Sequence, residues 1–161
     1  MRNLFITTFL LLSLLLVTAS YSADFDKGQT FANNGDFATA FKEFKPIADQ
    51  GSVYAQYYLS QIYIYGLGTQ QDFKEAARYL GLAAKQGFVY AQYDLGKLYY
   101  YGDGVDQDYL YAFMWWEIAN INGLEKALKT KEMFYEDKIS SKIKKAHDLA
   151  ETCLIKNYKS C

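Results

Sequence analysis

The chain has 161 residues, of which 51% are hydrophobic, so it can form one domain with a sizeable core. Its formal net charge of −1 gives no reason to expect nucleic-acid binding. A single proline suits a mostly helical protein, because proline breaks helix interiors.

The first 23 residues have the features of a secretory signal peptide. Arg2 supplies a positive charge, residues 4–17 carry none, and small residues follow up to Ala23. We therefore predict cleavage near residue 22 or 23 and a mature protein that is periplasmic or secreted. The alternative is a retained anchor, because residues 4–23 approach the ~20 residues that a membrane-spanning helix needs. If it is not cleaved, this segment is the only part of the chain that we expect to contact the membrane.

Residues 53–87 and 89–123 repeat one another with an offset of 36, and 15 of the 35 aligned positions are identical. Each copy has the pattern of two helices. In the first copy, apolar residues between Ala55 and Tyr65 follow the 3.6-residue period, and Gly66 suits the left-handed position that ends a helix. Asp72 is a good N-cap for the second helix, and Gly87 ends it.

The repeat extends in both directions along the chain. Asp36 and Ala40 lie 36 residues before Asp72 and Ala76, so residues 24–51 form a degenerate first repeat. Full repeats follow at 52–87 and 88–123, and residues 124–161 form a helical cap. We expect cap helices near residues 125–134 and from residue 140 or 141 towards 154. Because one hairpin cannot bury both faces, we predict an all-α fold, an α-solenoid of antiparallel helix hairpins with a C-terminal capping helix pair.

Both cysteines, Cys153 and Cys161, lie in this cap. Export to an oxidising compartment favours a disulfide between them. A continuous helix would hold them about 12 Å apart, whereas a disulfide needs Cα atoms within about 7 Å. We therefore expect the last helix to end near Asn157 and the tail to fold back. Their spacing differs from the C-x-x-C of redox centres, so this bond is expected to be structural.

A family resemblance rests on the stretch from Ala91 to Ala112. It reads Ala-Gln-Tyr-x-Leu-Gly-x-x-Tyr-x-x-Gly-x-Gly-Val-x-x-Asp-x-x-x-Ala and resembles the Sel-one-like repeat of the tetratricopeptide-like superfamily. The preceding copy matches with two departures, Ser60 and Thr69. The resemblance implies a protein-binding scaffold, with roles in envelope signalling, host interaction or complex assembly. The tail is similar to the ends of exported bacterial members.

No residues form a convincing catalytic or metal-binding pattern, so we expect neither an enzyme nor a cofactor. The one histidine, His147, lies in a lysine-rich helix without a predicted nucleophile. Asp103, Asp106 and Asp108 surround a glycine, but their spacing does not meet that of a calcium-binding EF-hand, and Asp108 is explained as an N-cap. We therefore expect no metal site.

The aromatic residues divide into two groups. Tyr79 and Trp115 occupy core-facing repeat positions, whereas Trp116 lies off them. The family's geometry implies that the first helices of successive repeats line a concave face. Tyrosine is enriched at binding hot spots. We therefore predict six partner-binding residues, three from each full repeat: Tyr58, Gln61, Tyr65, Asp94, Lys97 and Tyr101.

The sequence favours an exported interaction scaffold or adaptor in the bacterial envelope or outside the cell. Its partner is expected to be a protein or peptide rather than nucleic acid, and the chain is expected to be a monomer. Residues 24–124 carry 7 basic and 12 acidic residues, so this acidic part favours basic partners. The alternative is a periplasmic immunity protein that inhibits one toxic enzyme. A β-lactam hydrolase is a third hypothesis, because some cysteine-rich exported relatives have been described so, but this chain has only one cysteine pair.

Overall fold

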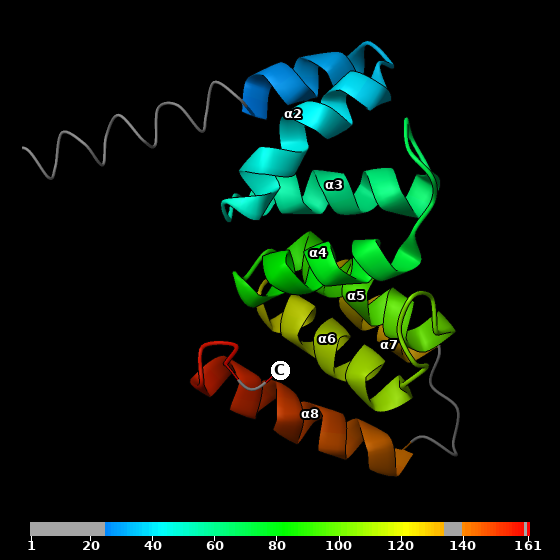
Figure 1. Ribbon diagram of the computed structural model, residues 1–161. Helices are drawn as coiled ribbons and strands as arrows, with labels where there is room; N and C mark the ends of the chain where they lie inside the picture. The colour runs from blue at the N-terminus through cyan, green and yellow to red at the C-terminus, as the bar shows by residue number, and fades with distance from the viewer. Residues whose placement is uncertain (1–24, 134–139, 160) are drawn as a thin grey trace, which may run out of the picture.

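A computed structural model describes residues 25–133, 140–159 and 161, and over these residues every regular element is a helix. The predicted signal peptide lies outside the described residues. Residues 25–33 are helical. The helices that follow are α2 (Phe37–Asp49), α3 (Val53–Tyr65), α4 (Phe73–Lys85), α5 (Val89–Tyr101), α6 (Tyr109–Ile121), α7 (Glu125–Met133) and α8 (Ser140–Ile155). They stack one upon the next, with segment 25–33 at one end and α8 at the other (Figure 1).

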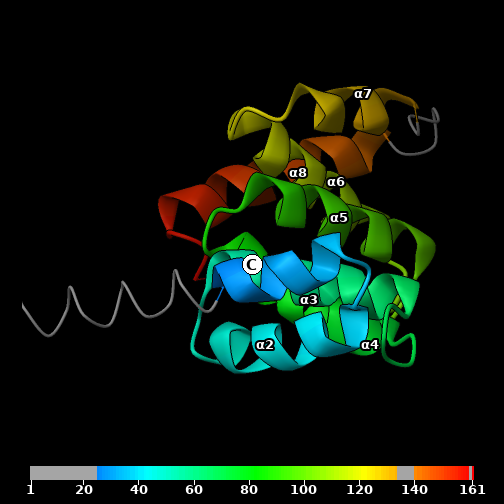
Figure 2. The same cartoon turned by 90° about the horizontal axis from the view of Figure 1, so that it is seen from above.

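The helices confirm the predicted solenoid. Helices α2, α4 and α6 each have 13 residues and begin 36 residues apart, as do α3 and α5. Consecutive helices pack against each other from α2 to α7, and α8 returns to pack on α6. Figure 2, seen from above, shows α7 on the opposite side of the stack from α2 and α4. None of the described helices is long and apolar enough to cross a membrane.

Aspartates at equivalent positions start the second helix of each repeat. The carboxylate of Asp72 accepts backbone N–H bonds from Lys74 and Glu75, both at 3.0 Å. Asp108 accepts two equivalent bonds at the start of α6, and Asp36 accepts one, from the N–H of Thr39, at the start of α2. Each bond satisfies an N–H group that would otherwise lack a partner in the first turn. The N-cap role predicted for Asp72 and Asp108 is confirmed.

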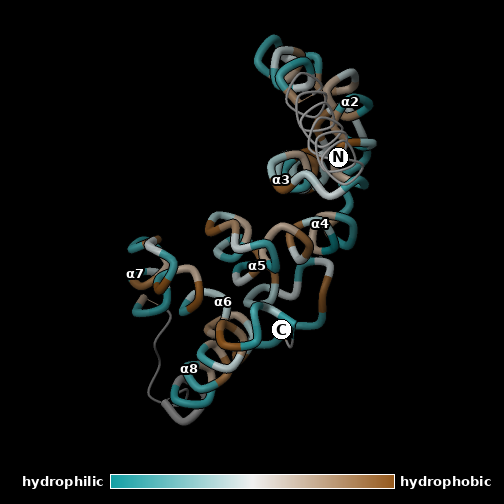
Figure 3. The backbone as a smooth tube through the Cα atoms, turned by 90° about the vertical axis from the view of Figure 1, so that its left-hand side faces the viewer, coloured by the Kyte–Doolittle hydropathy of each residue, from teal (hydrophilic) through white to brown (hydrophobic). Residues whose placement is uncertain are grey.

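The helices form two layers that bend together (Figure 3). Helices α3, α5 and α7 lie on the inner side of the bend, and α2, α4, α6 and α8 lie outside them. Alanines at one position of each second helix, Ala40, Ala76 and Ala112, are fully buried and allow close packing between the layers. Buried Gln56 and Gln92 each donate to a carbonyl at the end of the preceding helix, at 3.0 and 3.1 Å.

Two glycines set the contact between successive repeats. A β-carbon on Gly68 would lie 2.3 Å from the backbone nitrogen of Ala38 at the start of α2. On Gly104 it would lie 2.2 Å from the backbone of Phe73 at the start of α4. Both residues also have φ near +70° (+67° and +70°), a conformation that L side chains rarely adopt. The loop after each first helix therefore touches the previous repeat backbone to backbone.

The core contains both tryptophans, which corrects one sequence prediction. Tyr79 and Trp115 are buried, as predicted. Trp116 was expected outside the core-facing positions, but it is fully buried. Its ring occupies the space that Gly96 leaves free, and its indole N–H donates to the carbonyl of Tyr93 at 3.0 Å. Because Gly96 on α5 is small, the core beside it has room for side chains from two successive positions of α6, Trp115 and Trp116.

The C-terminal cap is held to α6 by Glu117, which is 9% exposed. The Lys131 ammonium on α7 and the His147 imidazole on α8 both contact its carboxylate. Burial raises the pKa of Glu117, but the hydrogen bonds and charges of Lys131 and His147 outweigh burial and keep this pKa below its ordinary value. Glu117 therefore remains ionised and joins three helices.

The tail folds back after α8 and forms the predicted disulfide. Asn157 and Tyr158 have φ of 48° and 62°, and they reverse the chain direction just beyond the helix. Cys153 and Cys161 then have Cα atoms 5.6 Å apart and are bonded. The disulfide fixes the end of the tail against the core, where Cys153 is 1% exposed.

Two glycines inside helices provide a matched test of this packing. A β-carbon on Gly81 would meet no atom within 4 Å, whereas one on Gly96 would lie 2.5 Å from Trp116 Nε1. We expect Gly81→Ala to raise the free energy of unfolding by about 1 kcal/mol through helix propensity. Gly96→Ala is expected to lower it by about 2 kcal/mol, because the displaced indole loses its buried hydrogen bond. Urea unfolding monitored by circular dichroism measures both changes, and equal effects would contradict this packing.

Candidate functional site

The six predicted residues lie on one stripe of α3 and α5. Tyr58, Gln61 and Tyr65 belong to α3, and Asp94, Lys97 and Tyr101 occupy the equivalent positions of α5. All six line one of two pockets on these helices. Because Gln61 and Tyr65 line both pockets, the two hollows adjoin. We call them together the inner groove.

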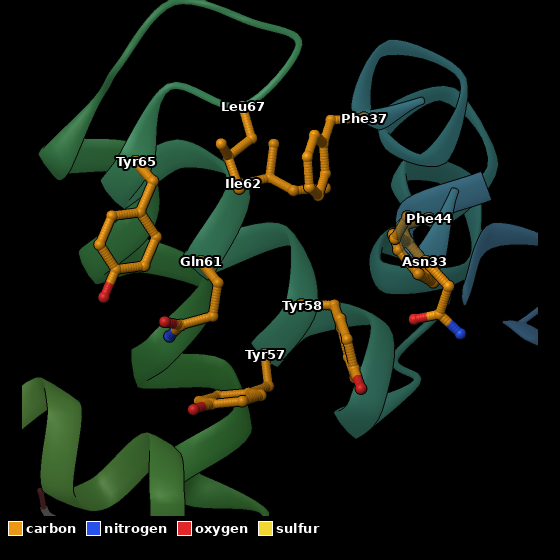
Figure 4. A pocket seen from close by; sticks show the side chains of 10 residues that line it. Asn33, Phe37, Phe44, Tyr57, Tyr58, Gln61, Ile62, Tyr65 and Leu67 are labelled. Atoms are coloured by element: carbon orange, nitrogen blue, oxygen red, sulfur yellow. The ribbon is translucent and has the colours of Figure 1, made fainter. Parts of the chain in front are cut away.

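The first pocket lies between the first repeat and α3 and has a volume of about 350 Å³. Figure 4 shows Phe37, Phe44 and Asn33 on the side of the first repeat, across from the side chains of α3. The residues that line it are Ala32, Asn33, Phe37, Phe44, Tyr57, Tyr58, Gln61, Ile62, Tyr65 and Leu67. None of these carries a charged side chain, so this pocket is an aromatic and aliphatic hollow.

The second pocket lies between α3 and α5 and has a volume of about 170 Å³. The residues that line it are Gln61, Ile64, Tyr65, Phe73, Asp94, Lys97, Leu98, Tyr101 and Asp103. Three of them have charged side chains: Asp94, Lys97 and Asp103. This pocket is therefore smaller and more polar than the first.

The two pockets are copies of one another within the repeat. Six positions that line the first pocket line the second after a shift of 36 residues. Three keep their character: Phe37 becomes Phe73, Ile62 becomes Leu98, and Tyr65 becomes Tyr101. The other three change from neutral to charged: Tyr58 becomes Asp94, Gln61 becomes Lys97, and Leu67 becomes Asp103. The repeat thus builds one hollow twice with different chemistry.

Tyr58 is held in place by the first repeat. Its ring packs against Phe25 and Phe44, with centroids 5.5 and 5.4 Å away, and its hydroxyl accepts a hydrogen bond from Gln29 at 3.1 Å. The side chain is half-buried. Tyr58 therefore forms a wall of the first pocket.

Asp94 is the centre of a hydrogen-bond network between α3 and α5. It is 8% exposed and accepts bonds from the Tyr57 hydroxyl at 3.3 Å and the Gln61 amide at 3.1 Å. The Lys97 ammonium lies 2.7 Å from its other carboxylate oxygen. Burial lowers the pKa of Lys97, but the hydrogen bond and charge of Asp94 outweigh burial and raise this pKa above its ordinary value. The two charges therefore neutralise each other within the protein.

Tyr65 and Tyr101 are the exposed aromatic residues of the inner groove. Tyr65 is 65% exposed and Tyr101 is 58% exposed, and they are the last residues of α3 and α5. Tyr54 and Tyr90, in the first turns of the same helices, are also more than half exposed. Both helices therefore expose a tyrosine near each end.

Several residues of the groove were not predicted from the sequence. Phe37, Leu67, Phe73 and Asp103 line the pockets but lie in loops or at the starts of second helices. The six residues predicted from the sequence all lie on the first helices, so these four are not among them. The signal that could have found them is the 36-residue offset, because Leu67 and Asp103 are equivalent positions that differ in charge.

The described residues contain no group of three or more histidine, cysteine, aspartate or glutamate side chains arranged to hold a metal ion. Asp103, Asp106 and Asp108, which were weighed as calcium ligands, are not so arranged. Asp108 instead caps α6 through bonds to the N–H groups of Leu110 and Tyr111.

Comparisons of this chain with known families and solved structures identify the same repeat. The family model of the Sel1 repeat matches residues 53–88 and 89–124. A Sel1 repeat protein from Oxalobacter formigenes is 30% identical with a TM-score of 0.66, and the match covers 73% of this chain and 91% of that protein. No match is found among curated proteins.

Two further solved structures share the fold. A protective antigen of uropathogenic Escherichia coli strains that displays an SLR fold is 25% identical with a TM-score of 0.72, over 86% of this chain. This chain spans only 31% of that antigen's length. Helicobacter pylori cysteine rich protein B is 21% identical with a TM-score of 0.60, over 73% of this chain and 94% of that one. At this identity the last likeness concerns the fold alone.

Removing the carboxylate of Asp94 tests whether it has a structural role. We expect Asp94→Ala to lower the free energy of unfolding by about 1–2 kcal/mol, because Tyr57, Gln61 and Lys97 lose their shared acceptor. Asp103→Ala, the matched control in the same pocket, should change it by less than roughly 0.5 kcal/mol. Chemical denaturation of both variants provides the measurement. A loss at Asp103 as large as that at Asp94 would disprove this distinction.

Proposed function

Because the chain belongs to the Sel1 repeat family, we propose that it is a scaffold whose inner groove binds a segment of another protein. The observation that carries this proposal is the pair of adjoining pockets on α3 and α5. Their volumes, about 350 and 170 Å³, suit side chains of a bound segment. The contact residues of this proposal are the six identified from the sequence: Tyr58, Gln61, Tyr65, Asp94, Lys97 and Tyr101.

The chemistry of the groove supports binding rather than catalysis. Its buried carboxylate, Asp94, already accepts three interactions from the protein itself. A general base needs a free lone pair within reach of the substrate proton. By contrast, exposed tyrosine rings beside apolar hollows are typical of binding hot spots. Sel1 repeat proteins are generally scaffolds of this non-catalytic kind.

We further propose that the protein is exported and acts in the bacterial envelope or outside the cell. Two observations support this location. The N-terminal residues have the charge and hydrophobicity pattern of a signal peptide. The disulfide between Cys153 and Cys161 suits an oxidising compartment. No observation on the described residues favours the immunity-protein alternative, so the scaffold is the function that we adopt.

Site-specific photocrosslinking in the producing cell tests the proposed function. A benzophenone amino acid replaces Tyr65, Tyr101 or, as the control, Leu82, which is 41% exposed on the outer helix α4. We expect discrete protein adducts from positions 65 and 101 and none from position 82, because the partner occupies the inner groove. Adducts that form only from position 82, or adducts from none of the three positions, would refute the proposed groove.

A further inference from the structure

The two pockets of the inner groove differ in what they can bind. The first has no charged lining residue. At its rim lies Leu67, which packs against the core around Phe44 and Ile62. An apolar hollow gains free energy mainly by removing apolar surface from water. The first pocket therefore fits an aliphatic or aromatic side chain.

The second pocket has a carboxylate at the position of Leu67. This residue, Asp103, is half-buried and makes no side-chain hydrogen bond or ion pair within the described part of the chain. The other two charges of the pocket, on Asp94 and Lys97, neutralise each other at 2.7 Å. The negative charge of Asp103 is therefore not neutralised by another residue of the pocket, so the second pocket has a net negative charge.

Two other features of the second pocket favour a cation. The rings of Tyr65 and Tyr101 line it and are mostly exposed, and the face of an aromatic ring attracts a positive charge. These tyrosines are also the last residues of α3 and α5, so two helix C-termini lie there, and a helix C-terminus carries a partial negative charge. Residues 24–124 are acidic as a whole, which favours basic partners in general.

The repeat also fixes the distance between the two pockets. Each pocket lies beside the inner face of one first helix, and α3 and α5 are close enough for the Gln61 amide to donate to Asp94 at 3.1 Å, which implies a spacing of roughly 10 Å. A chain in the extended polyproline II conformation advances about 3.1 Å per residue and has three residues per turn, so side chains three positions apart point to the same side. Side chains that enter both pockets are therefore separated by about three residues along an extended segment.

We infer that the inner groove recognises an extended segment of its partner protein that carries an apolar residue about three positions from an arginine or lysine. The apolar side chain occupies the pocket at Leu67, and the basic side chain occupies the pocket at Asp103. This inference rests on the proposed function and adds the chemistry of the partner to it.

Selection from a phage-displayed library of random heptapeptides against the purified protein tests the motif directly. The expected result is enrichment of peptides with an apolar residue and a basic residue about three positions apart. Asp103→Lys should select acidic residues in place of basic ones. Leu67→Asp should select basic residues at both positions, because it gives the first pocket the chemistry of the second.

The matched control is Asp106→Lys, the same charge change at an exposed residue that lines neither pocket. It should leave the selected motif unchanged. For a peptide selected by the unmodified protein, we expect Asp103→Lys to weaken binding about tenfold or more and Asp106→Lys less than about twofold. Circular dichroism checks that each variant is folded.

The outcomes separate this inference from the proposed function. Peptides that crosslink to positions 65 and 101 but show no preference for a basic residue would overturn the inference and leave the groove as the binding site. An equal loss of binding in Asp103→Lys and Asp106→Lys would also overturn it, because attraction would then be non-specific. Failure to enrich any peptide would contradict both this inference and the proposed function.

Discussion

The structure depends on one backbone contact, made at Gly68 and again at Gly104. In each case the loop that follows a first helix touches the start of the second helix of the preceding repeat, with no room for a side chain. This contact fixes how far one repeat lies from the next. The fully buried alanines of the second helices and the hydrogen bonds of Gln56 and Gln92 then hold the same spacing through the core. Helices α3 and α5 are therefore aligned residue for residue.

The proposed function rests on the hollows that this alignment leaves unfilled. Because the backbone repeats, the hollow beside α3 returns beside α5 with Phe37 and Ile62 replaced by similar residues. The residues that differ, such as Leu67 and Asp103, then decide what each hollow can hold. A solenoid can thus present several pockets of different chemistry on one rigid surface. The hydrogen bond from Gln61 to Asp94 contributes by fixing a side chain that lines both hollows.

The fold was predictable from the sequence because its signals are local and repeated. The helix starts at Asp72 and Asp108 and the helix ends at Gly66 and Gly102 each follow from residues a few positions apart. The 36-residue offset shows that these local signals recur. The site was less predictable because its chemistry depends on contacts between repeats. The identity of Asp94 does not reveal that Tyr57, Gln61 and Lys97 all bond to it. In the same way, the burial of Trp116 depends on a glycine twenty residues earlier, on another helix.

On the proposed function, partners bind to the inner layer between successive first helices. Two-dimensional NMR of the isotopically labelled protein, titrated with a peptide chosen by the selection, tests it most directly. We expect the largest amide shift changes in residues 58–67 and 94–103, with small changes on α4 and α6. Shift changes concentrated on those outer helices, with the inner groove unaffected, would contradict it.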